Sequence, residues 1–164
     1  MNLSIFRYTM PSGKTLDYGK DNMDVYTFAR KLSENYMAKA SEREKLRVSF
    51  SDRVLQIFEA KEICVQTFQE LTLLSRNIFY LLRKQDYRPS FETVIALCAG
   101  LDLDIIITAE LLGKAGYAFD GSEKHNAYEA AITQFRGYPI HVRNEFLREL
   151  KIAGIKLLGE KDSE

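Results

Sequence analysis

The residue types that most often perform catalysis or bind metal ions are few and widely spaced in this chain. Its only histidines, His125 and His141, belong to no His-x-x-x-His motif, and no Cys-x-x-Cys motif is present, so the sequence predicts no zinc site. The glycine motifs that hold a nucleotide phosphate or a nucleophilic serine are also missing. We therefore expect a protein that is not an enzyme, with no catalytic residues, no metal and no cofactor, and no small-molecule ligand is evident.

The composition predicts a folded, soluble protein. Hydrophobic residues make up 46% of the 164, with only 3 Pro and 9 Gly, so burial of apolar side chains can offset the loss of chain entropy. The longest uncharged apolar stretch, Ile105 to Ala109, is far shorter than the roughly 20 residues of a membrane helix. The N-terminus also lacks the parts of a signal peptide. These features predict a cytoplasmic protein with no membrane partner.

Two cysteines and two aspartates are the remaining candidates for chemistry. Cys64 and Cys98 each stand between apolar neighbours, which in an unsecreted chain favours small hydrophobic side chains over a disulfide. Asp102 and Asp104 flank one leucine, and such a pair could perform acid/base chemistry. Acids in a short turn more often cap the next helix, and we expect Asp104 to do so.

The first 48 residues predict a small hairpin followed by a helix. Two β-prone runs surround Pro11-Ser12-Gly13 within residues 3 to 18. Apolar residues then recur at helical spacing over 25–36, and the charged stretch after them could continue this helix or restart it at Ser41. The apolar stripe consists of Val25, Phe28, Ala29, Leu32 and Tyr36. Because a lone hairpin is marginally stable in water, this part of the chain is the candidate contact of a homodimer.

From Phe50 onward the sequence predicts a series of short capped helices without strands. A serine or aspartate precedes four of the five apolar stripes, and short links favour a compact bundle without internal repeats. The predicted helices cover 52–61, 65–71, 75–84, 91–100 and 105–114, with Ser51, Ser75, Ser90 and Asp104 as caps. The side chains expected in the core are Val54, Leu55, Phe58, Phe68, Leu71, Phe79, Leu82, Val94, Leu97 and Cys98. The two histidines are expected on the surface of later helices.

Two short helices joined by a tight turn, with a basic loop after the second, have the layout of a helix-turn-helix. Residues 50–117 resemble the five-helix domain of the phage-repressor-like (Xre-type) regulators. The resemblance rests on Leu71–Arg76, Arg83-Lys84, Tyr87–Ser90, Glu92–Leu97 and Leu111–Tyr117. Residues 127–159 are similar to an extension found in many such bacterial proteins. The resemblance implies a helix-turn-helix domain at 49–118 and a helical extension at 119–164. Together with the hairpin and helix predicted at 1–48, which the resemblance does not cover, the expected fold is mainly α.

The resemblance also implies a function, which is sequence-specific binding of duplex DNA as a transcriptional regulator. It places the start of the helix 75–84 against base edges in the major groove. There Arg76 can pair with guanine, Asn77 with adenine, and Ile78 can contact a thymine methyl. The residues implied to contact the DNA backbone or to flank the bases are Ser75, Gln66, Tyr80, Arg83, Lys84 and Arg88.

The charge distribution is compatible with this partner. The net charge is zero, with 23 basic and 23 acidic residues, but the charges are unevenly distributed. Residues 75–90 contain Arg76, Arg83, Lys84 and Arg88 against the single acid Asp86. The segment implied to meet DNA is therefore locally basic.

Three positions depart from the family's pattern and support an alternative. Leu73 stands at the usual glycine of the tight turn, where a positive φ would be strained. Val65 replaces the polar residue that opens the second helix, and Leu81 stands where a polar side chain is usual. Residues 78–82 also form an unbroken apolar run, which is typical of a buried helix. The alternative is a degenerate helix-turn-helix that binds another protein and no DNA.

Overall fold

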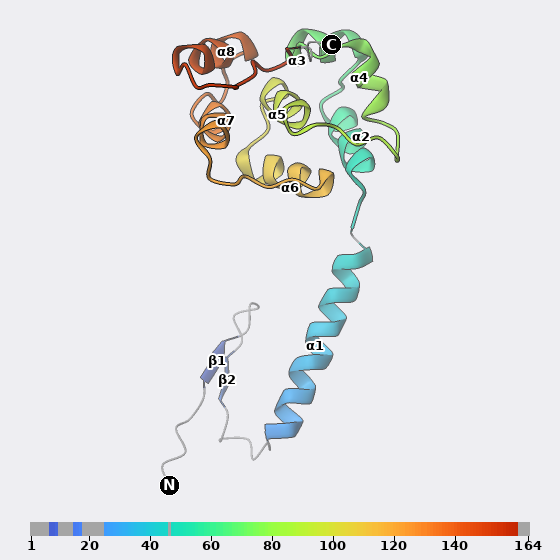
Figure 1. Ribbon diagram of the computed structural model, residues 1–164. Helices are drawn as coiled ribbons and strands as arrows, with labels where there is room; N and C mark the ends of the chain where they lie inside the picture. The colour runs from blue at the N-terminus through green and yellow to red at the C-terminus, as the bar shows by residue number, and fades with distance from the viewer. Residues whose placement is uncertain (1–6, 10–14, 18–24, 46, 161–164) are drawn as a thin grey trace. The chain divides into compact units, whose positions relative to one another are not determined.

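The protein is mainly α-helical in the computed structural model, which describes residues 7–9, 15–17, 25–45 and 47–160 (Figure 1). It divides into two compact units, Met1–Arg47 and Val48–Glu164. Among the described residues, no helix is both long enough and apolar enough to cross a membrane. Each unit is considered by itself.

The first unit contains one two-stranded sheet and one long helix in its described part. Strands β1 (Arg7–Thr9) and β2 (Thr15–Asp17) pair antiparallel, with Tyr8 opposite Leu16. The predicted turn at 11–13 lies outside the described residues. Helix α1 (Val25–Lys45) continues through the charged stretch, which is the first of the two predicted alternatives, and does not restart at Ser41. No glycine or proline interrupts this stretch, and its Glu, Lys, Arg and Ala residues all favour a helix.

The second unit begins with three short helices, α2 (Phe50–Ala60), α3 (Val65–Thr72) and α4 (Arg76–Leu81). The prediction of Ser51 as the cap of α2 is wrong, because Ser49 performs this role and Ser51 is buried. The Ser49 hydroxyl accepts a hydrogen bond from the N–H of Asp52 and donates one to its carboxylate. These hydrogen bonds make Ser49 the cap, so α2 begins at Phe50, two residues before the predicted start.

The core positions of α3 are Phe68 and Thr72, one helical turn apart, and both are buried. Leu71 was expected beside Phe68 but is 40% exposed. The buried hydroxyl of Thr72 is satisfied by two local hydrogen bonds. It donates to the carbonyl of Phe68 and accepts from the N–H of Leu74. Thr72 can therefore occupy the core position, and Leu71 faces outward.

Four further helices complete this unit: α5 (Phe91–Gly100), α6 (Ile105–Ala115), α7 (Glu123–Thr133) and α8 (Ile140–Glu149). Ser90 and Asp104 cap α5 and α6 as predicted, each accepting a hydrogen bond from an N–H three residues ahead. Helix α5 lies at the centre and contacts α3, α6, α7 and α8 (Figure 1). Val94 to Ala99 are all buried, because a helix that is apolar on every side can only be stable inside the core.

A buried arginine ties the later helices to this centre. Arg143 of α8 is fully buried, and it donates hydrogen bonds to the carbonyls of Ala131 and Tyr138 and, over 2.5 Å, to the Asp102 carboxylate. Asp102 also accepts the N–H of Gly137. Since each charged group is paired, this arrangement is structural. Asp102 thus holds α8 against the α5–α6 turn.

Candidate nucleic-acid interface

The outer face of α4 is open, although its sequence is largely apolar. Phe79 is buried, where its ring stacks on Phe58 with centroids 5.2 Å apart and meets the edge of Phe68 at 5.3 Å. Tyr80, the next residue, is 43% exposed, and its ring meets that of Phe79 edge-on with centroids 5.4 Å apart. Three aromatic rings therefore anchor one face of α4, so the apolar run of residues 78–82 does not make the whole helix part of the core.

The residues predicted to read bases lie in the first turn of α4. Ser75 caps the helix as predicted, its hydroxyl accepting the N–H of Ile78. Arg76 and Asn77 are exposed, and Ile78 is half-buried. One turn further on, the hydroxyl of Tyr80 lies 3.4 Å from a guanidinium nitrogen of Arg76. The structure thus places the guanidinium of Arg76 beside the phenol of Tyr80, with Asn77 also exposed in the same turn.

Two residues predicted to contact the DNA backbone, Arg83 and Lys84, lie beyond the end of α4 and not in its last turn. Helix α4 ends at Leu81, not at residue 84, so Arg83 and Lys84 belong to the turn that follows. Both are exposed, as is Arg88. Within residues 47–160, none of these cations nor Arg76 forms an ion pair, although the guanidinium of Arg83 lies 5.4 Å above the ring of Phe79. Their charges are available to an external anion.

The start of α3 presents fewer polar groups to a DNA phosphate than the family pattern implies. Val65 is half-buried and contributes no polar group. Gln66 is exposed in the first turn, and its amide donates to the Glu70 carboxylate over 3.1 Å. A phosphate contact from Gln66 would have to replace this bond.

The turn between α3 and α4 has a positive φ at Leu73, so the chain adopts there the conformation that the family's usual glycine would adopt without strain. Leu73 ends α3 in the left-handed region, with φ of 60°. On one side of the turn, α5 comes so close that a Cβ on Gly100 would lie 2.5 Å from the carbonyl oxygen of Leu71. Only glycine permits this contact, which fixes the turn against the core helix.

The C-terminal segment holds the other side of the turn, a role that the sequence analysis missed. A Cβ on Gly159 would lie 2.5 Å from the Cβ of Leu73. The side chain of Asn144 in α8 bonds both the N–H and the carbonyl of Leu158, and the Tyr128 hydroxyl bonds the backbone of Lys156. The only sequence signal was a glycine after two leucines, which is too common to predict this packing.

The cysteines and histidines form no common site. In the described ranges, no group of three or more His, Cys, Asp and Glu residues could hold a metal ion. Cys98 is buried as predicted, but Cys64 is exposed because it caps α3. His141 is exposed, whereas His125 is largely covered, stacked on Phe91 at 4.0 Å and paired with Asp120.

Comparison of the chain with protein-family models, with curated proteins and with solved structures finds no match. What the α4 face binds must therefore be inferred from its own residues.

Proposed function

We propose that this protein binds duplex DNA at specific sequences and acts as a transcriptional regulator, in the manner of the phage-repressor-like proteins that residues 50–117 resemble. The observation that carries the proposal is the exposure of Arg76 and Asn77 at the start of a helix, together with three exposed cations after that helix, Arg83, Lys84 and Arg88, which form no ion pair within residues 47–160. Base-reading groups and phosphate-binding groups are the two classes of contact that a specific DNA complex needs.

The chemistry of the first turn suits the major groove. The guanidinium of Arg76 can donate to O6 and N7 of guanine, and the amide of Asn77 matches N6 and N7 of adenine. Ile78 is half-buried, and its exposed part can contact a thymine methyl. Because α4 has only six residues, base contacts are confined to this turn, and Arg76 exchanges its contact with Tyr80 for a base.

The remaining residues suit the phosphate backbone. Arg83, Lys84 and Arg88 are expected to position the protein without reading sequence, and each phosphate contact releases bound counterions. The Tyr80 hydroxyl can donate to a phosphate oxygen. Gln66 lies in the first turn of α3, where N–H groups also favour an anion.

We further propose that the regulator is a cytoplasmic homodimer, because one short recognition helix buries little surface. Two copies would bind half-sites about 34 Å apart, one helical turn of DNA. The first unit is the candidate dimer contact, since α1 exposes Tyr26, Tyr36 and Met37. Deletion of residues 1–40 should leave a folded monomer with weaker DNA binding, and an unchanged dimer would contradict this part of the proposal.

The decisive experiment is selection of bound sequences from a random duplex pool at two salt concentrations. We expect an enriched motif, and weaker binding at the higher salt. Arg76→Ala and Asn77→Ala should each cost about 1–3 kcal/mol of sequence discrimination. The matched control is Asn126→Ala, which removes an exposed amide on α7 and should leave binding unchanged. Binding that shows neither a motif nor a salt dependence would refute the proposal.

A further inference from the structure

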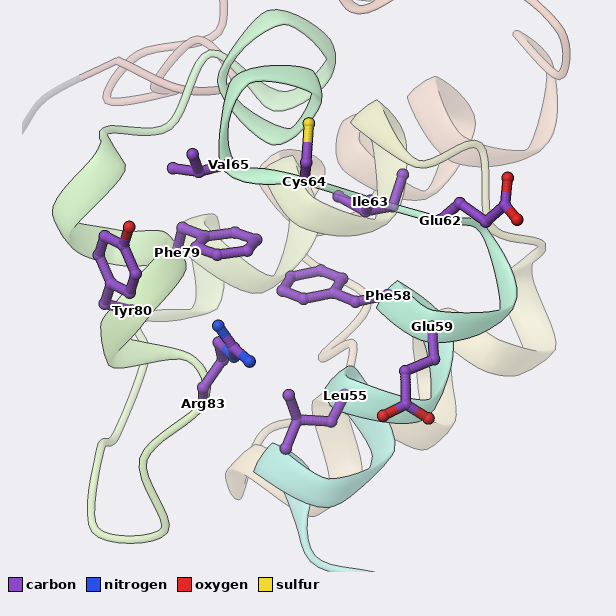
Figure 2. A pocket seen from close by; sticks show the side chains of 10 residues that line it. All are labelled: Leu55, Phe58, Glu59, Glu62, Ile63, Cys64, Val65, Phe79, Tyr80 and Arg83. Atoms are coloured by element: carbon purple, nitrogen blue, oxygen red, sulfur yellow. The ribbon is translucent and has the colours of Figure 1, made fainter.

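An apolar groove of about 480 Å³ lies between α2, the α2–α3 turn and α4 (Figure 2). Its floor contains the stacked rings of Phe58 and Phe79. The walls add half-buried aliphatic side chains from three different elements, Leu55 of α2, Ile63 of the turn and Val65 of α3. A volume of this size is within the range of ligand-binding pockets.

The edges of this groove carry opposite charges. Figure 2 shows the carboxylates of Glu59 and Glu62 on the α2 side and the guanidinium of Arg83 on the α4 side. Both glutamates are exposed, and within residues 47–160 neither side chain forms an ion pair or hydrogen bond with another residue. Two free carboxylates beside an apolar floor repel a phosphate backbone and attract a cation.

We infer that this α2–α4 groove docks an amphipathic helical segment of a partner protein, with apolar anchors above Phe58 and Phe79 and a Lys or Arg facing Glu59 and Glu62. Helices that bind in grooves place apolar side chains at i, i+3 or i+4 and i+7, which suits an apolar groove with walls on three elements. The asymmetric charges fix the orientation of the segment, because its other end meets Arg83. The groove lining shares Tyr80 and Arg83 with the proposed DNA-backbone contacts but does not include the base-reading residues Arg76 and Asn77, so the inference does not depend on DNA binding.

The test uses the purified full chain and a displayed library of amphipathic peptides about four helical turns long. The apolar anchors and the flanking residues are varied, with Lys, Arg, Asp, Glu and Ser allowed in the flanks. We expect enrichment of peptides with apolar anchors at helical spacing and a Lys or Arg in one flank. Enrichment of no peptide, or of peptides with acidic flanks only, would overturn the inference.

Charge reversal locates the bound peptide. Glu59→Lys and Glu62→Lys should each weaken an enriched peptide roughly tenfold or more, because attraction becomes repulsion across the groove. Glu149→Lys is the matched control, since this exposed glutamate lies at the end of α8, and it should bind like the unchanged chain. Equal affinity for all three variants would place the peptide elsewhere and refute the inference.

A second measurement does not depend on substitutions. Cys64 lines the groove and is exposed, whereas Cys98 is buried. A bound peptide should therefore slow the reaction of Cys64 with N-ethylmaleimide at least severalfold, and a scrambled peptide should not. An unchanged alkylation rate at saturating peptide would overturn the inference.

Substitutions in the groove distinguish peptide binding from DNA binding. Reversal of Glu59 or Glu62 adds positive charge, so it should leave DNA affinity unchanged or raise it while peptide affinity falls. Arg76→Ala should lower DNA affinity and leave peptide affinity unchanged. If either proposal fails, the other is still tested by its own variants.

Discussion

Leu73 and Gly159 lie in van der Waals contact, and both have left-handed backbone conformations, with φ of 60° and 79°. A Cβ atom on Gly159 would stand 2.5 Å from the Cβ of Leu73 and 2.7 Å from the carbonyl oxygen of Thr72. The turn that precedes α4 is therefore supported by the last described segment of the chain. This contact gives the C-terminal extension a role in positioning the predicted base-reading residues.

Replacement of Gly159 by alanine should destabilise the protein by about 2–4 kcal/mol, from overpacking and a strained positive φ together. Gly154→Ala is the matched control, because Gly154 also has a positive φ but has no atom within 4 Å of the added Cβ. The control should cost about 1 kcal/mol, the backbone cost alone. Urea unfolding of both variants measures the difference, and equal losses would show that the close approach carries no energy.

Replacement of Asp102 by asparagine should cost about 2 kcal/mol near neutral pH, because the buried Arg143 loses its charged hydrogen-bond partner. Asparagine tolerates the left-handed φ of 51° at this position, so the change tests the charge. The free energy of unfolding at pH 7, with far-ultraviolet circular dichroism as the signal, checks this value.

The Asp102–Arg143 pair should also make the free energy of unfolding depend on pH. Burial alone raises the pKa of Asp102, but the N–H of Gly137 and the cations of Arg143 and Arg136 outweigh it, so the pKa is lowered in the folded protein. A lowered carboxyl pKa contributes stability above the unfolded pKa of about 3.9, and this contribution is lost as pH falls through the folded pKa. The difference between Asp102→Asn and the unchanged chain should therefore shrink below about pH 4. A difference that is constant down to pH 2 would contradict this account.

Removal of one proposed phosphate contact should weaken DNA binding equally for all sequences. Lys84→Ala and Arg88→Ala are each expected to reduce the slope of log affinity against log salt by about 1, with the enriched motif unchanged. Lys151→Ala is the control, because this exposed lysine follows α8. A change of the enriched motif, or an unchanged slope, would show that Lys84 and Arg88 do not contact phosphates.

The two thiols should differ strongly in reactivity. Hydrogen bonds from the Thr67 hydroxyl and N–H lower the pKa of Cys64, whereas burial raises the pKa of Cys98 to about 12. A thiol-disulfide reagent at pH 7 should thus titrate one cysteine in the native protein and the second only in urea. Thr67→Val removes the hydroxyl and should slow the reaction of Cys64. Two fast thiols in the native state would contradict the burial of Cys98.

The sequence by itself determined most of the helices and many of their starts. Ser75, Ser90 and Asp104 were predicted as caps correctly, because a cap bonds an N–H only three residues ahead and needs no distant partner. The sequence indicated that a positive φ at Leu73 would be strained but did not decide whether the turn has one; the structure gives a φ of 60°. The base-reading set Arg76, Asn77 and Ile78 came from the resemblance and stays a prediction.

Only the tertiary structure decided which side chains face the core and what supports the turn. Leu71 and Cys64 were predicted inside but are exposed, because Thr72 satisfies its own hydroxyl locally and Cys64 serves as a cap. The contact of Gly159 with Leu73 joins segments far apart in the chain, and helical periodicity carries no information about such partners. The α2–α4 groove has the same origin, since its walls come from three elements that meet only after the chain has folded.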